Sequence, residues 1–516
     1  MAGVSWWDRF LIGVFPDWGL RRIQARAAAT LVSRHFEAAQ GGRRTSGWTR
    51  TSSDANAASG PALGPLRELS RDLRRNNGWV VRGVSVIGSN TVGWGIVPRP
   101  TGPTGRAKVA AAAWKEWATS PSCDYDGRLS FYGLQRLAMN CIVESGEVLI
   151  VNQPAKMSDG LAIPMRLQVL EPDYLDTHRN GLVGISGGPI IDGIEFDTQG
   201  RRVAYWLFTT HPGSQRLVTQ RFQSVRVPAE RVLHVFNVER PGQCRGVPWL
   251  AAAILKLKDL EDFADAELIK QKVAACFAAF VTDVDAAATP LGKGDTDDDG
   301  TALDHLEPGH ISYLPPGKSV AFAQPPTVQD SEFSARTLRQ IAVTLGVTYE
   351  DLTGDYSNVN YSSARMARIA HWANIHHWRW NMLVPQLCDG VWRWAMEYVA
   401  ALEEWPTTPG AEWSAPPMPI LEPDKEGLAY QRLVRIGAMT WPQMVRELGE
   451  DPVTQLDEIE RTNIDLDKRG IVLDADPRRT NSAGGVQVQA QAQASGAGAA
   501  DSADGGDGAE PDPSAA

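Results

Sequence analysis

The sequence predicts an α+β protein with more than one domain. At 516 residues it is longer than the chain that one hydrophobic core usually organises. Hydrophobic residues make up 43% and charged residues 22%, a globular composition that excludes a fully disordered, collagen-like or coiled-coil chain. Helical periodicity dominates both ends of the chain, whereas residues 147–238 show strand-like alternation with turn signals at short intervals.

Helical patterns dominate the part of the chain before residue 147. Helices are expected near 21–39, 65–76, 105–118 and 130–144. The helix at 65–76 follows from Leu66, Leu69 and Leu73, which recur at helical spacing before a stop at Asn76-Asn77-Gly78. Residues 79–98 are rich in β-branched residues and interrupted by glycine, which predicts strands joined by a turn.

The β-rich part begins after these helices. The segment "PMRLQVLEP" at 164–172 alternates apolar and polar residues, and "GIEFDTQGRRVAYWLF" at 193–208 predicts a hairpin whose turn is Thr198-Gln199-Gly200. After Pro248 comes the strongest helical pattern of the chain, at 249–280. The remaining expectations are a Gly/Asp-rich loop at 285–303, short strands within 306–325, helices at 332–345 and 361–402, a Pro-rich stretch at 405–425 and three short helices in 425–468.

The ends of the chain differ in charge and in tryptophan content. Residues 1–120 carry 17 basic and 7 acidic residues, although the whole chain has a formal charge of −10. Eight of the 18 tryptophans lie in 1–120 and eight in 372–441. Large aromatic side chains dominate core burial, so we expect these two ends to pack into one discontinuous domain from which the middle projects. Two independent cores are the alternative. Residues 481–516 have no aromatic residue, Lys or Arg, which predicts a solvated tail.

Cellular location is also indicated by composition. The five cysteines are scattered without paired spacing, which argues against a disulfide framework or a cysteine zinc site and favours a reducing compartment. The longest small and apolar run, "AACFAAFV" at 274–281, is too short to span a bilayer. The chain is therefore expected in the cytosol or in a virion, with no membrane partner.

Two motifs resemble nucleotide or hydrolase sites but lack their context. Gly317-Lys318-Ser319 ends like a P-loop, yet Ser312 stands where the first glycine belongs and a strand pattern follows. "GISGG" at 184–188 fits the nucleophile-elbow pattern around Ser186, but another strand follows where that elbow needs a helix. We expect both to be turns between strands.

Three charged or histidine-rich patterns remain. Asp295, Asp297 and Asp299 match the opening of an EF-hand loop, but Leu306 stands where the bidentate Glu belongs, so a solvated acidic loop is favoured. "HWANIHHW" at 371–378 lacks the spacing that puts two imidazoles on one helix face, and aromatic packing is the simpler interpretation. A basic stripe could meet phosphates or form a solvated helix face; it comprises Arg67, Arg71, Arg74, Arg75 and Arg82. No enzyme, cofactor or metal site is predicted.

Four stretches, taken in order, resemble the lambda-type family of tailed-bacteriophage portal proteins. They are "LRELSRDLRRNNGWVVRGVSVIGSNTVGWGI" at 66–96, "HVFNVERPGQCRGVPWLAAAILKLKDLEDFADAELIKQKVAACFAAF" at 234–280, residues 306–367 from "LEPGHISYLPPGKSVAFAQPP" to "NYSSARMA", and "GAMTWPQMVRELGED" at 437–451. Each is modest alone, whereas their ordered combination is specific.

The resemblance implies a ring of subunits, typically a dodecamer, at one vertex of a viral head, with double-stranded DNA passing through its channel. The implied partners are other copies of the chain, the terminase large subunit, the major capsid protein and a head–tail connector protein. The implied location is the virion, and the host cytoplasm during assembly. Portal parts map onto the chain as wing (1–129 and 282–420), stem helices (130–146 and 239–281), clip (147–238), crown (421–475) and disordered tail (476–516).

Two sets of residues follow from this mapping. The candidates for contact with DNA in the channel are Lys256, Lys258, Lys270 and Lys272, and the candidates for terminase docking are Arg201 and Arg202, beside the hairpin turn. Two alternatives stay open. One is a metal-dependent nuclease that uses Asp295, Asp297 and Asp299, and the other is a head-completion protein without a channel.

Overall fold

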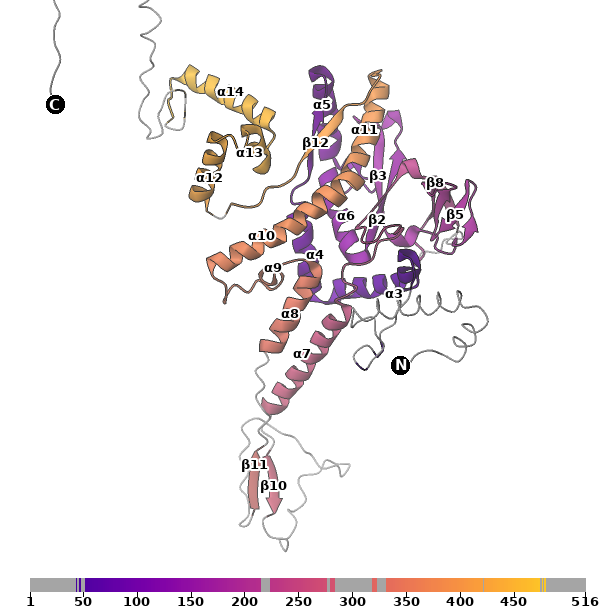
Figure 1. The fold of residues 1–516 in the computed structure, drawn as a ribbon, viewed down its shortest axis with the longest axis vertical. Helices are drawn as coiled ribbons and strands as arrows, with labels where there is room; N and C mark the ends of the chain where they lie inside the picture. The colour runs from indigo at the N-terminus through magenta and orange to yellow at the C-terminus, as the bar shows by residue number, and fades with distance from the viewer. Residues whose placement is uncertain are drawn as a thin grey trace, which may run out of the picture. The chain divides into compact units, whose positions relative to one another are not determined.

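The computed structural model in Figure 1 describes residues 43, 46–47, 52–214, 223–275, 279–283, 318–322, 331–420, 422–473, 476 and 478. The chain divides into two compact units. The smaller unit consists of Met1–Ala62 and Val238–Cys244, and the larger one of Leu63–Asn237 and Arg245–Ala516. Within the smaller unit, Asn56 accepts a hydrogen bond from the Cys244 amide (2.8 Å) and donates one to the Gly242 carbonyl (3.0 Å). These two bonds join parts of the unit that are far apart in the sequence.

The first elements are helices α3 (Ala55–Asn76) and α4 (Gly78–Thr91), followed by strand β1 (Val97–Thr101). The predicted strands at 79–98 are therefore wrong over most of their length. Asn77 caps α4, because its side chain accepts hydrogen bonds from the amides of Trp79 and Val80. The buried residues Val80, Val84 and Ile87 recur at helical spacing, so tertiary packing overrides the strand preference of β-branched residues.

The expected helices at 105–118 and 130–144 are confirmed as α5 (Thr104–Thr119) and α6 (Phe131–Ser145). The long helix expected at 361–402 is also confirmed. It consists of α10 (Tyr361–Trp378), a π-helical segment η7 (Arg379–Cys388) and α11 (Asp389–Leu402).

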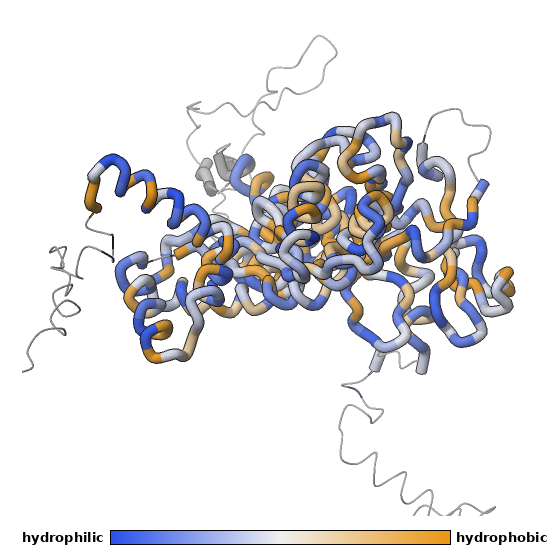
Figure 2. Tube along the Cα trace, turned by 90° about the horizontal axis from the view of Figure 1, so that it is seen from above, coloured by the Kyte–Doolittle hydropathy of each residue, from blue (hydrophilic) through white to orange (hydrophobic). Residues whose placement is uncertain are grey.

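The tryptophans of both ends meet in one core. The ring centroids of Trp114 and Trp392 lie 5.0 Å apart, and those of Trp114 and Trp413 lie 6.3 Å apart. One contiguous hydrophobic cluster contains these side chains together with residues of α4, α5, α6 and α11. Figure 2 shows hydrophobic segments gathered at the centre of the described fold. Trp114 and Trp117 thus share one core with Trp392 and Trp413, as expected of a discontinuous domain. Trp94 is 72% exposed, and the tryptophans before residue 52 lie outside the described residues.

The β-rich segment forms two sheets. The first has the order β3-β2-β9 and consists of β2 (Glu147–Pro154), β3 (Met165–Leu170) and β9 (Val232–Phe236). Its residues Val148, Leu167 and Val235 belong to the tryptophan-rich core. The expectation that the whole middle segment projects from that core is therefore wrong for this sheet.

The second sheet runs in sequence order from β4 to β8. Its strands are β4 (Leu182–Val183), β5 (Gly187–Ile191), β6 (Ile194–Asp197), β7 (Arg202–Phe208) and β8 (Ser224–Pro228). The predicted hairpin at 193–208 is confirmed as β6 and β7. The buried side chains of this sheet, such as Ile194 and Leu207, lie outside the main core cluster.

The helix predicted at 249–280 is α7 (Ile254–Ala275), so the prediction is wrong at both ends. Turn hydrogen bonds such as Ala253 N to Leu250 O precede it, and residues Ala279–Asp283 form strand β10, which pairs with β11 (Lys318–Phe322). Helix α8 (Ser331–Leu345) confirms the helix expected at 332–345. It lies beside α7 (Figure 1). The ring centroids of Phe263 on α7 and Phe333 on α8 are 4.5 Å apart. Helix α9 (Tyr349–Thr353) follows.

The last described part holds strand β12 (Gly410–Ser414), which pairs with β1, and three short helices. These are α12 (Pro423–Arg435), α13 (Trp441–Glu447) and α14 (Pro452–Arg469), as expected for 425–468. Of the helices within the described ranges, none combines the length and the apolar composition needed to cross a membrane. The expected helix at 21–39, the acidic loop at 285–303 and the tail at 481–516 lie outside the described residues.

Candidate functional site

Glu147, the first residue of β2, is the centre of a buried ionic cluster. Its carboxylate accepts two hydrogen bonds from the Arg245 guanidinium, at 2.8 and 2.6 Å, and one from the Gly246 amide at 2.7 Å. The Nε2 atom of His234 on β9 lies 2.8 Å from the other side of the carboxylate. The cluster therefore ties β2 and β9 to the chain segment that enters α7.

Burial and neighbouring charges shift the pKa values of Glu147 and His234 in opposite directions. Burial alone raises the pKa of Glu147, but Arg245 and His234 outweigh it, so this pKa lies well below its usual range. Burial lowers the pKa of His234, and Glu147 offsets this only in part. We conclude that His234 is a neutral imidazole that donates from Nε2 to an ionised carboxylate.

Two glycines make this arrangement possible. A Cβ on Gly246 would lie 2.2 Å from the carbonyl oxygen of Gly146, and a Cβ on Gly146, whose φ is +90°, would lie 2.5 Å from the Val247 carbonyl carbon. The two backbones therefore cross in direct contact, and only glycine fits at this crossing.

The basic stripe lies on α3, except for Arg82 on α4, and reaches this cluster through Arg67. Arg71 contacts both Glu171 (3.0 Å) and Asp173, while Arg67 lies 3.6 Å from Asp173 and 3.8 Å from Glu147. The other members of the stripe also have protein partners: Arg74 with the Val81 carbonyl, Arg75 with Asp72, and Arg82 with the Asp351 carbonyl. Arg67 and Arg71 thus bind carboxylates of the protein itself, whereas Arg75 is 67% exposed. Contact with phosphates stays a prediction for the exposed members of the stripe.

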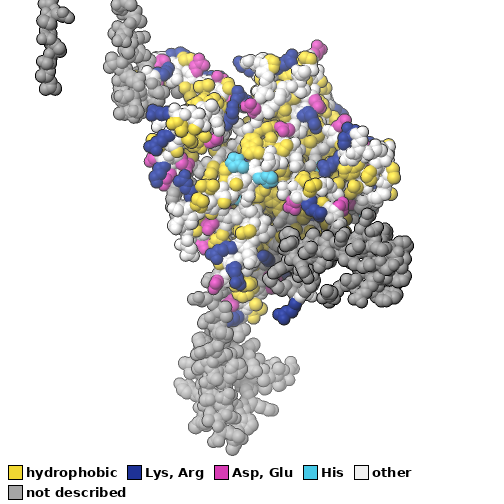
Figure 3. Space-filling view, viewed as in Figure 1, with side chains coloured by type: hydrophobic (Ala, Val, Ile, Leu, Met, Phe, Trp, Pro, Cys, Tyr) yellow, Lys and Arg dark blue, Asp and Glu magenta, His cyan; other side chains and the backbone are white. Residues whose placement is uncertain are grey.

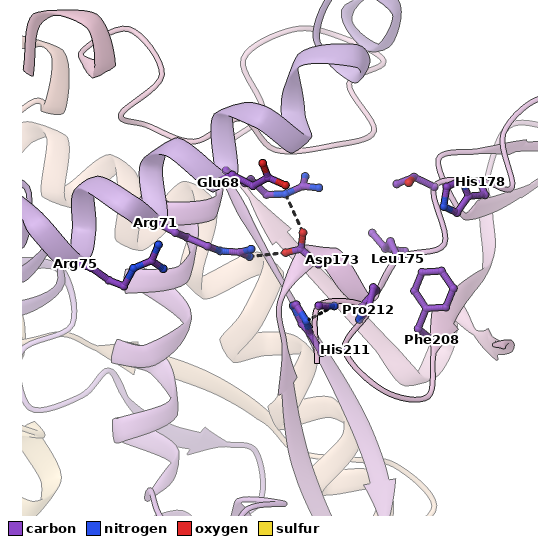
Figure 4. Close-up of a pocket in the computed structure, with 12 residues that line it drawn as sticks. Glu68, Arg71, Arg75, Asp173, Leu175, His178, Phe208, His211 and Pro212 are labelled. Atoms are coloured by element: carbon purple, nitrogen blue, oxygen red, sulfur yellow. Dashed lines mark hydrogen bonds and ion pairs between the residues drawn. The ribbon is translucent and has the colours of Figure 1, made fainter. Parts of the chain in front are cut away.

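A pocket of about 480 Å³ opens beside this stripe. Figure 4 shows Arg71 pointing at Asp173 across it, with Leu175, Phe208 and Pro212 on the other side. Glu171, Asp173 and His211 can bring one ligand atom each within 4.8 Å of one another, a metal-type cluster among the described residues. The Arg71 guanidinium contacts both carboxylates, however, so a cation would have to displace it, and we assign no metal here.

The four lysine candidates lie on α7, but they do not share a face. Lys256 and Lys270 are fourteen residues apart, about four helical turns, and therefore lie on the same side of the helix. Lys258 and Lys272 have the same spacing and lie on the opposite side. Phe263, which contacts α8, is on the side of the first pair. Lys258 and Lys272 are accordingly exposed, and the other two are half-buried. Lys258 pairs with Asp262 at 2.9 Å and Lys270 with Glu267 at 3.5 Å.

The two arginine candidates for terminase docking, Arg201 and Arg202, have different surroundings. Arg201 is 74% exposed, and its guanidinium binds Asp197 at 2.9 Å. Arg202 begins β7 and lies over the Phe236 ring, 5.6 Å from its centroid, which directs it toward the three-stranded sheet. Only Arg201 is available at the surface beside the hairpin turn.

The rejected motifs have structural roles. The hydroxyl of Ser186 donates to Glu195 at 2.9 Å, and Arg226 donates to the same carboxylate at 2.8 Å. These bonds lower the pKa of Glu195 to about 2. Lys318 and Ser319 lie in strand β11 instead of at a helix start, as the sequence predicts. His371 is buried, with its Nδ1 atom 2.8 Å from the Gly346 carbonyl oxygen. The rings of Trp372 and His376 lie 6.0 Å apart, in agreement with aromatic packing of this segment.

Sequence reasoning missed Glu147, Arg245 and Glu195. The available signal was the presence of Arg245 and His234 inside one quoted stretch, 234–280, but no spacing rule connects them to Glu147. Asp295, Asp297 and Asp299, the candidates for a nuclease site, lie outside the described residues.

The chain is similar to known phage proteins. The sequence model described as "Phage portal protein, lambda family" matches residues 41–379. A probable portal protein of Halomonas phage phiHAP-1 is 30% identical over 372 residues, which cover 67% of this chain and 68% of that protein. The portal protein of Escherichia phage N15 is 24% identical over 69% of this chain and 73% of its own length. Portal protein B of Escherichia phage lambda is 24% identical over 63% of this chain and 67% of its own length.

Solved structures show weaker likenesses. A chain in the virion of a native gene transfer agent particle has a TM-score of 0.44 and 16% identity, over 79% of this chain and 98% of that chain. An HK97-family phage portal protein from Corynebacterium diphtheriae has a TM-score of 0.28 and 10% identity, over 65% of this chain and 92% of that chain.

Proposed function

The chain belongs to the lambda family of phage portal proteins, and we propose from this membership that its copies form a closed ring around a channel for double-stranded DNA. The observation that carries the proposal is the family match over residues 41–379. A channel on a rotational axis requires heterologous contacts, in which two different surfaces of neighbouring copies meet. The ring would stand at one vertex of the viral head, after assembly in the host cytoplasm.

The partners of such a ring follow from its position. We propose that the terminase large subunit docks on it during packaging, that the major capsid protein surrounds it, and that a head–tail connector protein replaces terminase afterwards. Bond chemistry would belong to terminase, and the ring itself would act as a structural element.

We reassign the stem and the clip. A clip needs to project on two helices that lie side by side, and α7 and α8 do so through Phe263 and Phe333. The chain between them includes the antiparallel pair of β10 and β11. Helix α6, by contrast, buries Phe131, Met139 and Ile142 in the main core. These contacts favour α7 and α8 as the stem and the segment between them as the clip, in place of 130–146 and 147–238.

The crown keeps its place, whereas the wing loses residues 282–345 to the clip and to the stem helix α8. The tryptophan-rich core formed by both ends would be the wing, and α12 to α14 would be the crown. The three-stranded sheet would belong to the wing, since it shares that core. The five-stranded sheet would stand on its rim.

The composition of α7 suits a channel that passes DNA without holding it. Besides its four lysines this helix carries five acidic residues: Asp259, Glu261, Asp262, Asp265 and Glu267. Six to ten phosphate contacts per protein change DNA affinity by roughly 10³ to 10⁵ over a modest salt range, so a strongly basic wall would act as a brake. We propose Lys258 and Lys272, on the face away from α8, as the channel-side pair.

Negative-stain microscopy and mass photometry of the purified full chain test the ring. We expect closed rings with a central hole. Monomers and dimers alone, across the micromolar range and in assembly buffers, would contradict the proposal and favour the head-completion alternative. Nuclease activity with Mg²⁺ that disappears on replacing Asp295, Asp297 and Asp299 by Asn would favour the enzyme alternative.

A further inference from the structure

Helices α12 and α14 bury almost no side chain against the part of the chain that the structure describes. Within α12, α13 and α14 the buried residues are Val445 and Pro452 alone. Both α12 and α14 nevertheless carry large aliphatic side chains at the surface. A helix that leaves its apolar stripe exposed gains little stability from packing, which marks these stripes as contact surfaces.

On α14, exposed aliphatic side chains share one stripe with two acidic residues. Val453, Asp457, Glu460 and Ile464 recur at positions i, i+4, i+7 and i+11, so their side chains follow one line along the helix. Leu456, which is 53% exposed, lies beside this line. We call this set the α14 face.

On α12, exposed aliphatic side chains share one stripe with two basic residues. Leu428, Arg432 and Arg435 recur at i, i+4 and i+7, and Ile436, which is 74% exposed, extends the stripe at the end of the helix. We call this set the α12 face. Figure 3 shows hydrophobic, basic and acidic side chains together on the surface of this region.

The two faces match in spacing and in charge. The α12 face has two positive charges three residues apart, on Arg432 and Arg435. The α14 face has two negative charges at the same spacing, on Asp457 and Glu460. Aliphatic side chains surround both pairs. No ion pair within the described residues joins these four groups to one another. We propose that the α12 face of one copy docks on the α14 face of a neighbouring copy, which deepens the ring function proposed above and rests on it.

A second copy is the favoured occupant because the two complementary faces belong to the same chain. Each face repels itself, so two copies cannot meet through identical surfaces. The contact is therefore heterologous, and repetition of one heterologous contact leads to a ring or a filament. Opposite charges at such a contact select the partner and its register.

Ion pairs that do not involve the two faces link α14 and the neighbouring helix α13 to β1 and β12. Arg99 on β1 lies 3.4 Å from Asp451, the capping residue of α14, and Arg446 on α13 lies 3.8 Å from Glu412 on β12. Neither pair includes a residue of the two faces. Substitutions on the faces should thus leave the helices folded.

Charge reversal with mixing tests the contact. One variant carries Arg432→Glu and Arg435→Glu, and the other carries Asp457→Lys and Glu460→Lys. Each alone should lose the ring species at a concentration at which the unaltered chain forms rings, because its two faces then have the same charge. Mixed in equal amounts, each variant supplies the face that the other needs, and assembly should return. Mass photometry measures the amount of the ring species for each variant alone and for the mixture.

A matched control carries Glu458→Lys and Asp465→Lys, the same change in charge on another side of α14, and should assemble normally. Circular dichroism and thermal melting establish that all variants are folded. Normal rings from either face variant, or no recovery on mixing two folded variants, would overturn the contact while the ring function stands. Absence of rings from the unaltered chain would overturn the ring function itself.

Discussion

Buried charges hold the centre of the molecule in one arrangement at the scale of single residues. Glu147 accepts four short polar contacts, from Arg245, His234 and Gly246, in a site closed to solvent. Such a cluster adds little net stability compared with an apolar core, since each ion loses its hydration. Removing one partner is costly, because the remaining charge stays buried alone. The cluster thus specifies how β2, β9 and the start of the 245–253 segment fit together.

Arg245→Met tests the cluster. The substitution leaves the Glu147 carboxylate buried opposite an apolar side chain, and we expect a loss of about 3–5 kcal/mol in the free energy of unfolding. Urea denaturation measures it. The control is Arg201→Met, which removes an exposed partner of Asp197 and should change stability little. Equal effects of the two substitutions would contradict the role of burial.

The pH dependence of stability tests the state of His234. Burial lowers its pKa below the ordinary 6.5, so the unfolded chain binds a proton that the folded one excludes. This contribution to stability is complete above pH 6.5 and is lost as the pH falls below it, by at most about 1.4 kcal/mol per pH unit. Glu147, whose pKa is depressed, loses its contribution only below its ordinary value of 4.5.

We expect His234→Gln, which keeps a donor for Glu147, to reduce the stability lost between pH 7.5 and 5.5 in urea denaturation. The pKa of His376 is also lowered, by burial, so His376→Gln serves as a comparison and should remove only the share of His376. An unchanged loss in His234→Gln would mean that the pKa of His234 is the same in the folded and unfolded chains.

Close packing between elements decides which helical glycines are required. A Cβ on Gly390 in α11 would lie 2.4 Å from Cδ2 of Leu233 on β9, whereas a Cβ on Gly427 in α12 has no atom of the structure within 4 Å. Glycine costs a helix up to about 1 kcal/mol relative to alanine, so the gain from substitution is similar at both sites and the packing cost differs.

Gly390→Ala should therefore destabilise the protein, because overpacking costs about 1–3 kcal/mol and exceeds the gain in helix propensity. Gly427→Ala should stabilise it by up to about 1 kcal/mol. Thermal melting of both variants provides the measurement. Stabilisation by Gly390→Ala would show that β9 can move away from α11 at little cost.

At the scale of the whole molecule, two separate regions are candidates for the surface on which, as proposed above, terminase would dock. These are the segment between α7 and α8, and the five-stranded sheet that carries Arg201. The helices α7 and α8 lie side by side and would hold the first segment away from the core, whereas Arg201 is bonded to Asp197 within its own hairpin.

Replacing residues 284–317 by a short Gly-Ser linker, with β10 and β11 retained, should abolish terminase capture in a pull-down with assembled rings. Arg201→Glu should leave capture intact. The reverse result would return the clip to 147–238. Ring formation by both variants, seen by microscopy, is the control for assembly.

The sequence by itself determined much about this protein, because periodicity and turn chemistry are local. It indicated the helices at 105–118, 130–144, 332–345 and 361–402, the hairpin at 193–208, and the family, which depends on the order of several stretches. The pairing of the tryptophan-rich ends was also predictable, since large aromatic side chains need burial.

Only the tertiary structure decided the rest. Residues 79–91 are helical because Asn77 caps them and because Val80, Val84 and Ile87 find a core, which strand propensity cannot reveal. Glu147 and Arg245 are 98 residues apart in the sequence, and their contact exists only because Gly146 and Gly246 let two backbones cross. Helical spacing separates the four lysines of α7 into two pairs, but only the packing of α8 against Phe263 shows which pair is exposed. Likewise, only the contact of Arg202 with the Phe236 ring separates it from the exposed Arg201.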